Sequence, residues 1–376
     1  MSVRRFALVA GGGTGGHLVP ALALSRALAG GRPDGSVELV GSRRGLDAVL
    51  LEDSGLPVTL LPGRGILRRA DARALASNVA AVAGLASALL LALALVLRRR
   101  PAVVVAVGGY ASVPVALAAW LVRVPVVLVN LDARPGAANR LVGRFAAAAA
   151  VAFPGTPLPR AVVTGAPVRA EIVAVARPSP QTRTAARRVL CLPEDRTVVG
   201  VVGGSLGARR VNEATLELAQ RWADRTDVAV YHVVGRRDFA WVHAEVGGHP
   251  LLCYRQVEFE SQMAQFYAAS DVVVCRAGAN TVAELAVVGV PSVLVPLPGA
   301  PGDHQRANAA ALEETGAAMV LDDAVCDGEH LQVILEPLLA SAPRLQQMAT
   351  SAAALGRPQA LQAVTALVEA NAKPRG

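Results

Sequence analysis

Lysine is nearly absent from this sequence, since Lys373 is the only one among 37 lysine and arginine residues. This absence excludes an ordinary P-loop nucleoside triphosphatase. Gly11 and Gly16 satisfy the GxxxxG half of that motif, but the next position, which requires lysine, holds His17. The net charge of +8 therefore rests on arginine and favours acidic partners such as phosphates and anionic lipids.

Cysteine and aromatic residues are also scarce. The four cysteines lie far apart, with no CxxC pair and no histidine at metal-ligand spacing, so we expect no metal site and a reducing cytoplasm. Aromatic residues make up 3% of the chain and are not interleaved with a basic patch, so we expect no nucleic-acid partner. The first residues lead into an apolar run without a signal-peptide pattern, and secretion is not expected.

Charge is missing from residues 79–97, a run of nineteen residues that ends in Arg98, Arg99 and Arg100. A run of that length could cross a bilayer. Residues 102–107, however, have the pattern of a buried strand, which a membrane span would separate from its own sheet. The stronger alternatives are a core helix and a helix whose apolar face touches a membrane surface beside the arginines.

Short apolar runs alternate with helical patterns twice along the 376 residues, which predicts two α/β domains with parallel, doubly wound sheets. The predicted strands are 6–10, 37–40, 58–61, 103–107, 126–129, 148–152, 198–202, 228–233, 251–254, 272–275, 292–295 and 318–321. We place the domain boundary near residue 165. This gives domains 1–165 and 166–376, with a final helix at about 358–371 that could pack back onto the first domain.

Each half opens with a strand, a glycine-rich turn and a helix, an arrangement that receives anions. The turns are GGGTGGH at residues 11–17 and GGSLGA at residues 203–208. His17 lies in the first turn of its helix, where the positive end of the helix dipole disfavours a charged imidazole and keeps it available as a base. The alternative is a histidine that only caps or packs.

The first turn also satisfies the dinucleotide-binding pattern GxGxxG at Gly11, Gly13 and Gly16. Glu38 lies at roughly the spacing of the acid that binds ribose in such proteins. It falls inside its predicted strand, however, and not at the carboxyl end. An NAD-dependent oxidoreductase therefore stays open only as a weaker alternative.

Two later segments carry polar residues after predicted strands. Residues 275–284, CRAGANTVAE, end at Glu284, whose carboxylate could accept both hydroxyls of a ribose; the alternative is an exposed first-turn glutamate that complements the helix dipole. Residues 296–308 follow the next strand and include Asp303, His304, Gln305 and Asn308. A polar loop at the carboxyl end of a strand is typical of a site in a doubly wound sheet.

These segments, with GGYAS at 108–112, GAPVR at 165–169 and DHQRAN at 303–308, together resemble the MurG family of glycosyltransferase family 28. The resemblance implies the glycosyltransferase B fold, two Rossmann-like domains facing across a cleft, with no metal or other cofactor. It implies inverting transfer of N-acetylglucosamine from UDP-GlcNAc to lipid-linked muramyl-pentapeptide (lipid I) in peptidoglycan synthesis. It also implies a peripheral location on the cytoplasmic face of the membrane, with residues 79–97 facing anionic lipid.

The same resemblance assigns roles to individual residues. His17 is the base that deprotonates the acceptor hydroxyl. The implied contacts to the UDP-sugar and to the acceptor diphosphate are Thr14, Gly15, Gly16, Asp132, Asn139, Arg169, Ser205, Ala279, Asn280, Thr281, Glu284 and Gln305. The helix that starts after Ser205 is implied to stabilise the leaving diphosphate in place of a metal.

The chain departs from the family pattern at two places. Family members normally carry His-Glu-Gln-Asn where this chain has Val129, Asn130, Leu131 and Asp132, and Leu206 replaces a usual glutamine. Two further alternatives therefore stay open. One is a MurG-like paralogue that glycosylates another acceptor, such as a specialised metabolite, with another NDP-sugar; the other is a sugar-nucleotide binding protein without catalysis.

Overall fold

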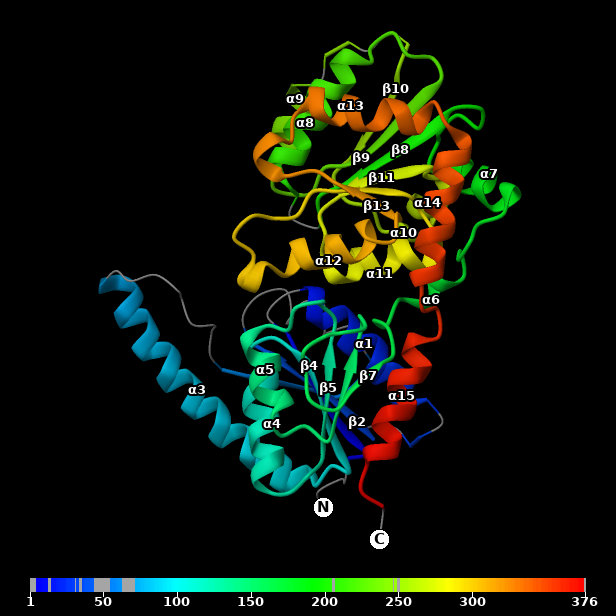
Figure 1. Ribbon diagram of the computed structural model, residues 1–376. Coiled ribbons are helices and arrows are strands. Elements are labelled where there is room, and N and C mark those ends of the chain that lie inside the picture. Colours follow the sequence, from blue (N-terminus) through cyan, green and yellow to red (C-terminus); the bar gives the residue numbers. More distant parts are fainter. Residues whose placement is uncertain are drawn as a thin grey trace. The chain divides into compact units, whose positions relative to one another are not determined.

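The computed structural model describes residues 5–12, 15–30, 32–33, 36–43, 55–62, 72–204, 207–245, 247–248 and 251–374, with the backbone alone for residues 15 and 72–83. It divides into two compact units. The first unit comprises residues 1–167 and 359–376, and the second comprises residues 168–358. Each unit is a parallel sheet flanked by helices (Figure 1), which confirms the predicted α/β class with two Rossmann-like domains.

The sheet of the first unit has the strand order β3-β2-β1-β4-β5-β6-β7. Its strands are β1 Ala7–Gly11, β2 Val37–Ser42, β3 Val58–Leu61, β4 Val103–Gly108, β5 Val126–Asn130, β6 Ala148–Val151 and β7 Ala161–Val163. The order reverses between β1 and β4, and ligands of such sheets bind where the carboxyl ends of the strands meet this switch point. The sequence does not predict β7, because it is an exposed edge strand of three residues.

The helices of the first unit are α1 Gly15–Ala29, α3 Ala72–Arg99, α4 Ser112–Leu121, α5 Ala137–Gly143 and α15 Ala360–Asn371. The last of these, red in Figure 1, packs against α1 and against strands β4, β5 and β6 of the sheet. Val364 and Val368 are buried there, and the Arg32 guanidinium lies 2.6 Å from the Glu369 carboxylate. The end of the chain is therefore part of the first unit.

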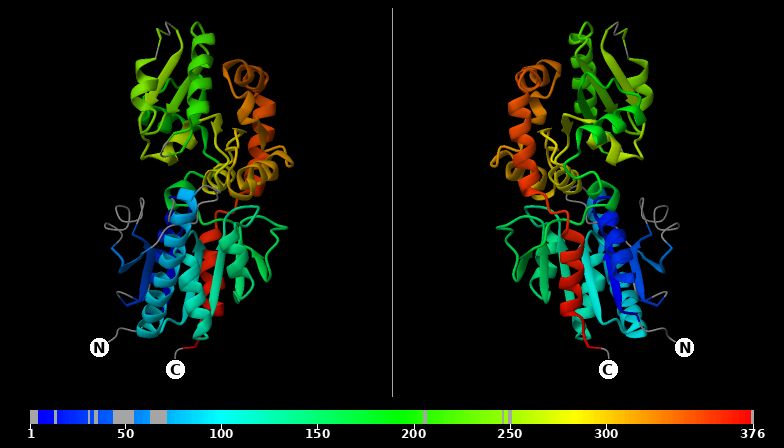
Figure 2. Two further views of the ribbon diagram at one scale, coloured as in Figure 1. Left: turned by 90° about the vertical axis from the view of Figure 1, so that its left-hand side faces the viewer. Right: turned by 90° about the vertical axis from the view of Figure 1, so that its right-hand side faces the viewer.

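The uncharged segment 79–97 lies within α3, whose C-terminal part packs against α4 (Figure 1; Figure 2). The helix has two faces. Ala88, Ala92 and Leu95 are buried in the core of the first unit, while Leu90 and Leu97 are exposed to solvent. Among the described residues, no helix is long and apolar enough to cross a membrane.

The sheet of the second unit has the order β10-β9-β8-β11-β12-β13, with a switch point between β8 and β11. Its strands are β8 Thr197–Val202, β9 Val228–Val233, β10 Cys253–Val257, β11 Val272–Cys275, β12 Ser292–Leu294 and β13 Ala318–Val320. Its helices are α6 Ala170–Val173, α7 Pro180–Val189, α8 Arg209–Arg221, α9 Phe239–Ala244, α10 Met263–Ala269, α11 Ala279–Val288, α12 His304–Glu313, α13 Gly328–Leu339 and α14 Ala342–Leu355.

Candidate functional site

His17 lies over the end of β4 in the first unit. A β-carbon built on Gly108 would lie 2.6 Å from Cδ2 and 2.9 Å from Nε2 of the His17 imidazole. Gly109 lies even closer to the first turn, because a β-carbon at that position would overlap the carbonyl oxygen of Gly12. The turns after β1 and β4 therefore interlock through glycines that have no room for a side chain.

Two hydrogen-bonded asparagines lie near Gly108. The Oδ1 atom of Asn139, on α5, would lie 3.5 Å from a β-carbon on Gly108. Asn139 donates from Nδ2 to Oδ1 of Asn130, 2.9 Å away, and Asn130 donates from its own Nδ2 to the carbonyl oxygen of Asp132 at 2.6 Å. We call Gly108, His17, Asn130 and Asn139 the first-turn cluster; it lies at the switch point of the first sheet.

The departures at residues 129–132 divide into two kinds. Val129 and Leu131 are buried hydrophobic residues of the core. Asn130 bonds to Asn139, and Asp132 is half-buried. Among the predicted residues, Gly15 and Gly16 form the start of α1, while Thr14 lies outside the described residues. Gly108 and Asn130, which were not predicted as site residues, belong to the cluster; the GGYAS segment after a strand is the signal that points to Gly108.

Glu38 has a structural role. Its buried carboxylate lies 3.0 Å from the guanidinium of Arg5 and 2.8 Å from that of Arg99, and it accepts a hydrogen bond from the Thr59 hydroxyl at 2.7 Å. A carboxylate engaged in this way at the interior of β2 has no access to a cofactor ribose. Glu38 therefore cannot serve as the ribose-binding acid that the dinucleotide hypothesis requires.

The second glycine turn follows β8. Gly204 and Gly207 have φ values of +97° and +86°, which favour glycine, and a β-carbon on Gly207 would lie 2.5 Å from the carbonyl oxygen of Val234. Ser205 and Leu206 lie outside the described residues. The turn leads into α8, whose first-turn amides are available to an anion.

A buried polar network supports this turn. Asn212 donates from Nδ2 to the Val234 carbonyl at 3.1 Å and to Asp238 at 3.0 Å, so its Oδ1 is left to accept from Nε2 of His232, 3.0 Å away. His232 Nδ1 then accepts from the Tyr254 hydroxyl at 2.8 Å. Burial lowers the pKa of His232 to about 3, so the imidazole in this network is neutral.

This network predicts a loss of stability in acid. The unfolded chain takes up a proton on His232 below about pH 6.5, whereas the folded chain does so only near pH 3. The contribution of His232 to the free energy of unfolding is therefore fully present above pH 6.5. Below that pH, about 1.4 kcal/mol of it is lost for each pH unit, down to about pH 3. We expect thermal unfolding of a His232→Gln variant to depend less on pH between 6.5 and 4.5 than that of the parent. A variant at the exposed His243, His243→Gln, should keep the parent's dependence, and equal slopes for all three proteins would contradict the prediction.

Glu284 lies on α11 in a buried position, 8% exposed, and not as an exposed residue of the first helical turn. Its Oε1 accepts from Nε of Arg169 at 3.1 Å and from Nη2 at 2.9 Å. Its Oε2 accepts from the hydroxyl of Tyr267 at 2.9 Å. Burial raises the pKa of the Glu284 carboxyl, and Arg169 opposes that shift. The structure thus brings together two predicted residues, Arg169 and Glu284, with Tyr267, which the sequence analysis did not identify.

The remaining predicted residues of the second unit lie after β11 and β12. Ala279, Asn280 and Thr281 form the half-buried first turn of α11. Gln305, at the start of α12, accepts from the backbone amide of Leu297 at 2.9 Å and so shapes the loop after β12. Asn308 is fully buried and donates to the carbonyl of Ala277 at 3.2 Å, which joins α12 to the turn after β11.

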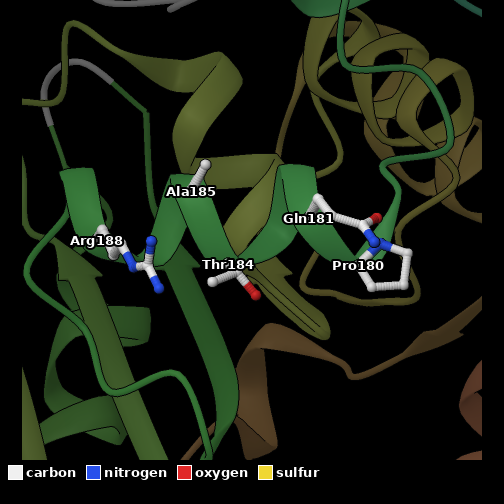
Figure 3. A pocket seen from close by; sticks show the side chains of 5 residues that line it. All are labelled: Pro180, Gln181, Thr184, Ala185 and Arg188. Carbon is white, nitrogen blue, oxygen red and sulfur yellow. The ribbon is translucent and has the colours of Figure 1, made fainter.

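The second unit also has a surface hollow away from the predicted site residues. A hollow along α7 is lined by Pro180, Gln181, Thr184, Ala185 and Arg188 (Figure 3). All five residues come from one helix, and none of the predicted site residues is among them. In the part of the chain that the structure describes, no group of three or more histidine, cysteine, aspartate or glutamate residues could hold a metal ion.

Comparisons with known proteins agree with this arrangement. Residues 7–151 match the glycosyltransferase family 28 N-terminal domain, and residues 198–364 match the family 28 C-terminal domain. A Moorella thermoacetica relative is 39% identical over 371 residues, which cover 96% of this chain and 97% of the relative. It is named UDP-N-acetylglucosamine--N-acetylmuramyl-(pentapeptide) pyrophosphoryl-undecaprenol N-acetylglucosamine transferase. A relative of the same name from Streptomyces coelicolor is 37% identical, with 94% of each chain covered.

Solved structures show the same fold. The crystal structure of Acinetobacter baumannii MurG matches with a TM-score of 0.75 and 28% identity, and covers 97% of this chain and 99% of that one. The calicheamicin glycosyltransferase CalG4, at 17% identity and a TM-score of 0.67, covers 98% of each chain and shares the glycosyltransferase B fold. With relatives of this similarity along nearly its whole length, the chain belongs to glycosyltransferase family 28 and to the MurG group within it.

Proposed function

We propose that this chain transfers N-acetylglucosamine from UDP-GlcNAc to lipid I, an undecaprenyl-diphosphate-linked muramyl-pentapeptide, in peptidoglycan synthesis. The observation that carries the proposal is the transferase name shared by relatives up to 39% identical over 96% of the chain. It is supported by two glycine turns at the switch points of two sheets, one beside a histidine and the other preceding a helix that can receive a diphosphate. The burial of Val129 and Leu131 also supports it, because these two departures from the family pattern concern the core.

In this proposal, the second unit holds the donor. Glu284 accepts hydrogen bonds from the two hydroxyls of the ribose, and the guanidinium of Arg169, beside it, turns to the diphosphate. Ser205 and the start of α8 receive the same diphosphate, and Ala279, Asn280, Thr281 and Gln305 contact the sugar. As UDP departs, the negative charge on its diphosphate is stabilised by Arg169 and the positive end of α8.

The first unit holds the acceptor and the base. Thr14, Gly15 and Gly16 receive the acceptor diphosphate at the start of α1, and Asp132 and Asn139 orient the sugar groups beside it. The acceptor hydroxyl passes its proton to His17 as its oxygen forms a bond to the anomeric carbon, and the bond from that carbon to UDP breaks. A single displacement of this kind inverts the anomeric centre.

The reaction is tested with purified chain, UDP-GlcNAc and a lipid I analogue. We expect release of one UDP for each disaccharide product, at a rate well above that with donor alone. UDP release no faster than in the donor-only control, with a lipid I analogue that an established MurG uses, would rule out this acceptor.

Gly108 provides a test of the first-turn cluster. We expect a Gly108→Ala variant to lower kcat at least tenfold, because the new methyl group would lie less than 3 Å from the His17 ring and displace it. The φ of +112° at Gly108 adds backbone strain. The measurement is the rate of UDP release at saturating substrates.

A matched control exists in the same unit. Gly155 also has a positive φ, +75°, but nothing lies within 4 Å of a β-carbon at that position. Gly155→Ala should therefore keep kcat near that of the parent. Equal rates for the two variants would contradict the proposed placement of His17.

We further propose that the first unit binds the surface of an anionic membrane, at the cytoplasmic face. α3 and α4 both end at the amino-terminal ends of the strands of the first sheet, because they lead into the neighbouring parallel strands β4 and β5. The exposed residues Leu90, Leu91, Leu97, Trp120 and Leu121 form what we call the apolar surface. The exposed Arg98, Arg100 and Arg123 flank these helix ends and would face lipid phosphates.

Binding to vesicles tests this proposal. A double variant, Leu90→Gln with Leu97→Gln, should bind vesicles of phosphatidylglycerol and phosphatidylcholine about tenfold less tightly, because two apolar side chains no longer enter the bilayer boundary. Val333, on α13 of the second unit, is as exposed as Leu90, at 66% against 68%. Val333→Gln should bind as the parent does. Unchanged binding of the double variant in a sedimentation assay would remove the apolar surface from the membrane contact.

A further inference from the structure

The carboxylate of Glu284 has a second partner besides Arg169. Arg169 directs two N–H groups to Oε1, whereas the Tyr267 hydroxyl donates to Oε2. The two partners come from different elements: Arg169 precedes α6, and Tyr267 is part of α10. Each carboxylate oxygen is therefore engaged from its own side.

Tyr267 can act only as a donor in this pair. Its side chain is fully buried, and Phe266 packs edge-on against its ring, with 5.3 Å between the centroids. Burial raises the pKa of the Tyr267 hydroxyl well above its ordinary value, so it keeps its proton. Arg169, by contrast, is partly exposed, with 30% of its side chain accessible to solvent, so its guanidinium has space to turn.

The number of acceptor positions on Glu284 limits how a ribose can bind. A carboxylate offers about four lone-pair positions. Tyr267 and the two N–H groups of Arg169 take three of them, which leaves one for the two vicinal hydroxyls of a ribose. Arg169 can withdraw toward the donor diphosphate, whereas Tyr267 has no space to move. Tyr267 is thus the contact that stays when the donor binds.

We infer that Tyr267 is the positioning residue for the donor nucleoside, because its hydroxyl fixes the Glu284 carboxylate in the orientation that meets both ribose hydroxyls. The inference rests on the proposed function and deepens it. It makes Tyr267 a determinant of selectivity for a ribonucleoside diphosphate over its 2′-deoxy counterpart, although Tyr267 itself does not touch the donor.

The test compares UDP with 2′-deoxy-UDP by isothermal titration calorimetry. We expect Tyr267→Phe to raise the Kd for UDP about tenfold, which corresponds to one lost hydrogen bond to a charged group. The Kd for 2′-deoxy-UDP should rise much less. The preference for UDP, which is the ratio of the Kd for 2′-deoxy-UDP to the Kd for UDP, should therefore fall. The KM for UDP-GlcNAc should rise with UDP affinity, while kcat at saturation stays near that of the parent.

A control for simple loss of stability is present in the same unit. Tyr231 is a second buried tyrosine whose hydroxyl donates to a buried glutamate, Glu260, at 2.6 Å. Tyr231→Phe should leave the preference for UDP over 2′-deoxy-UDP unchanged. The inference is overturned if Tyr267→Phe weakens both nucleotides equally, or if it narrows the preference no more than Tyr231→Phe does.

Glu284→Gln separates this inference from the proposed function. If Glu284→Gln narrows the preference for UDP and Tyr267→Phe does not, Glu284 binds the ribose without help from Tyr267, and the inference alone fails. If Glu284→Gln also leaves the preference intact, then the assignment of Glu284 to the ribose fails, and the inference falls with it.

Discussion

Replacing His17 with alanine is expected to lower kcat by about 10²-fold to 10⁴-fold, the usual contribution of a positioned general base. The acceptor hydroxyl would then have to lose its proton to water as it attacks the anomeric carbon. The affinity for UDP should stay within about twofold of the parent value, because the donor residues belong to the second unit. Single-turnover UDP release and calorimetry with UDP measure the two effects separately.

The exposed His243 supplies the control for this variant. His243→Ala should have the kinetics of the parent. A His17→Ala variant that keeps more than about a third of the parent kcat would show that the histidine only packs against Gly108 and that another group accepts the proton.

The second large effect is expected at Glu284. A Glu284→Gln variant keeps the shape of the side chain but removes the charge that accepts the ribose hydroxyls, and hydrogen bonds to charged groups contribute about 1.5 to 3 kcal/mol each. We expect the Kd for UDP to rise about 100-fold and the KM for UDP-GlcNAc to rise with it, whereas kcat at saturation falls less. Calorimetry with UDP and steady-state kinetics provide the measurement.

Glu260→Gln is the matched control, because Glu260 is also buried and also accepts from a tyrosine. It should lower thermal stability without changing the Kd for UDP. A Kd for UDP within threefold of the parent value in Glu284→Gln would exclude the carboxylate from the donor site.

Most strands were predictable from the sequence because parallel strands covered on both faces are continuous apolar runs. The runs at 103–107 and 228–233, for instance, match β4 and β9 closely. The prediction was less accurate at the sheet edges, where burial is lower. All three residues of β7 are exposed. β10 begins two residues later than the pattern at 251–254 suggests and is only partly buried.

The candidate site was predictable where motifs follow strands, but its contacts were not. Glu284 was identifiable in the CRAGANTVAE segment, yet its burial depends on Arg169, which lies 115 positions earlier in the chain, and on Tyr267, 17 positions earlier. The approach of His17 to Gly108 likewise joins segments that only the pairing of β1 with β4 brings together. Contacts of this kind are set by sheet topology and not by spacing along the sequence.

The placement of α15 in the first unit has a consequence for how the polypeptide can be divided. Because the chain enters the second unit at Val168 and leaves it after Pro358, that unit is an insertion into the first. A contiguous fragment of residues 168–358 holds every element of the second unit. A fragment that ends at Pro167 lacks α15 and leaves α1 and the β5–β6 region uncovered. To produce the first unit alone, residues 1–167 therefore have to be joined to residues 359–376.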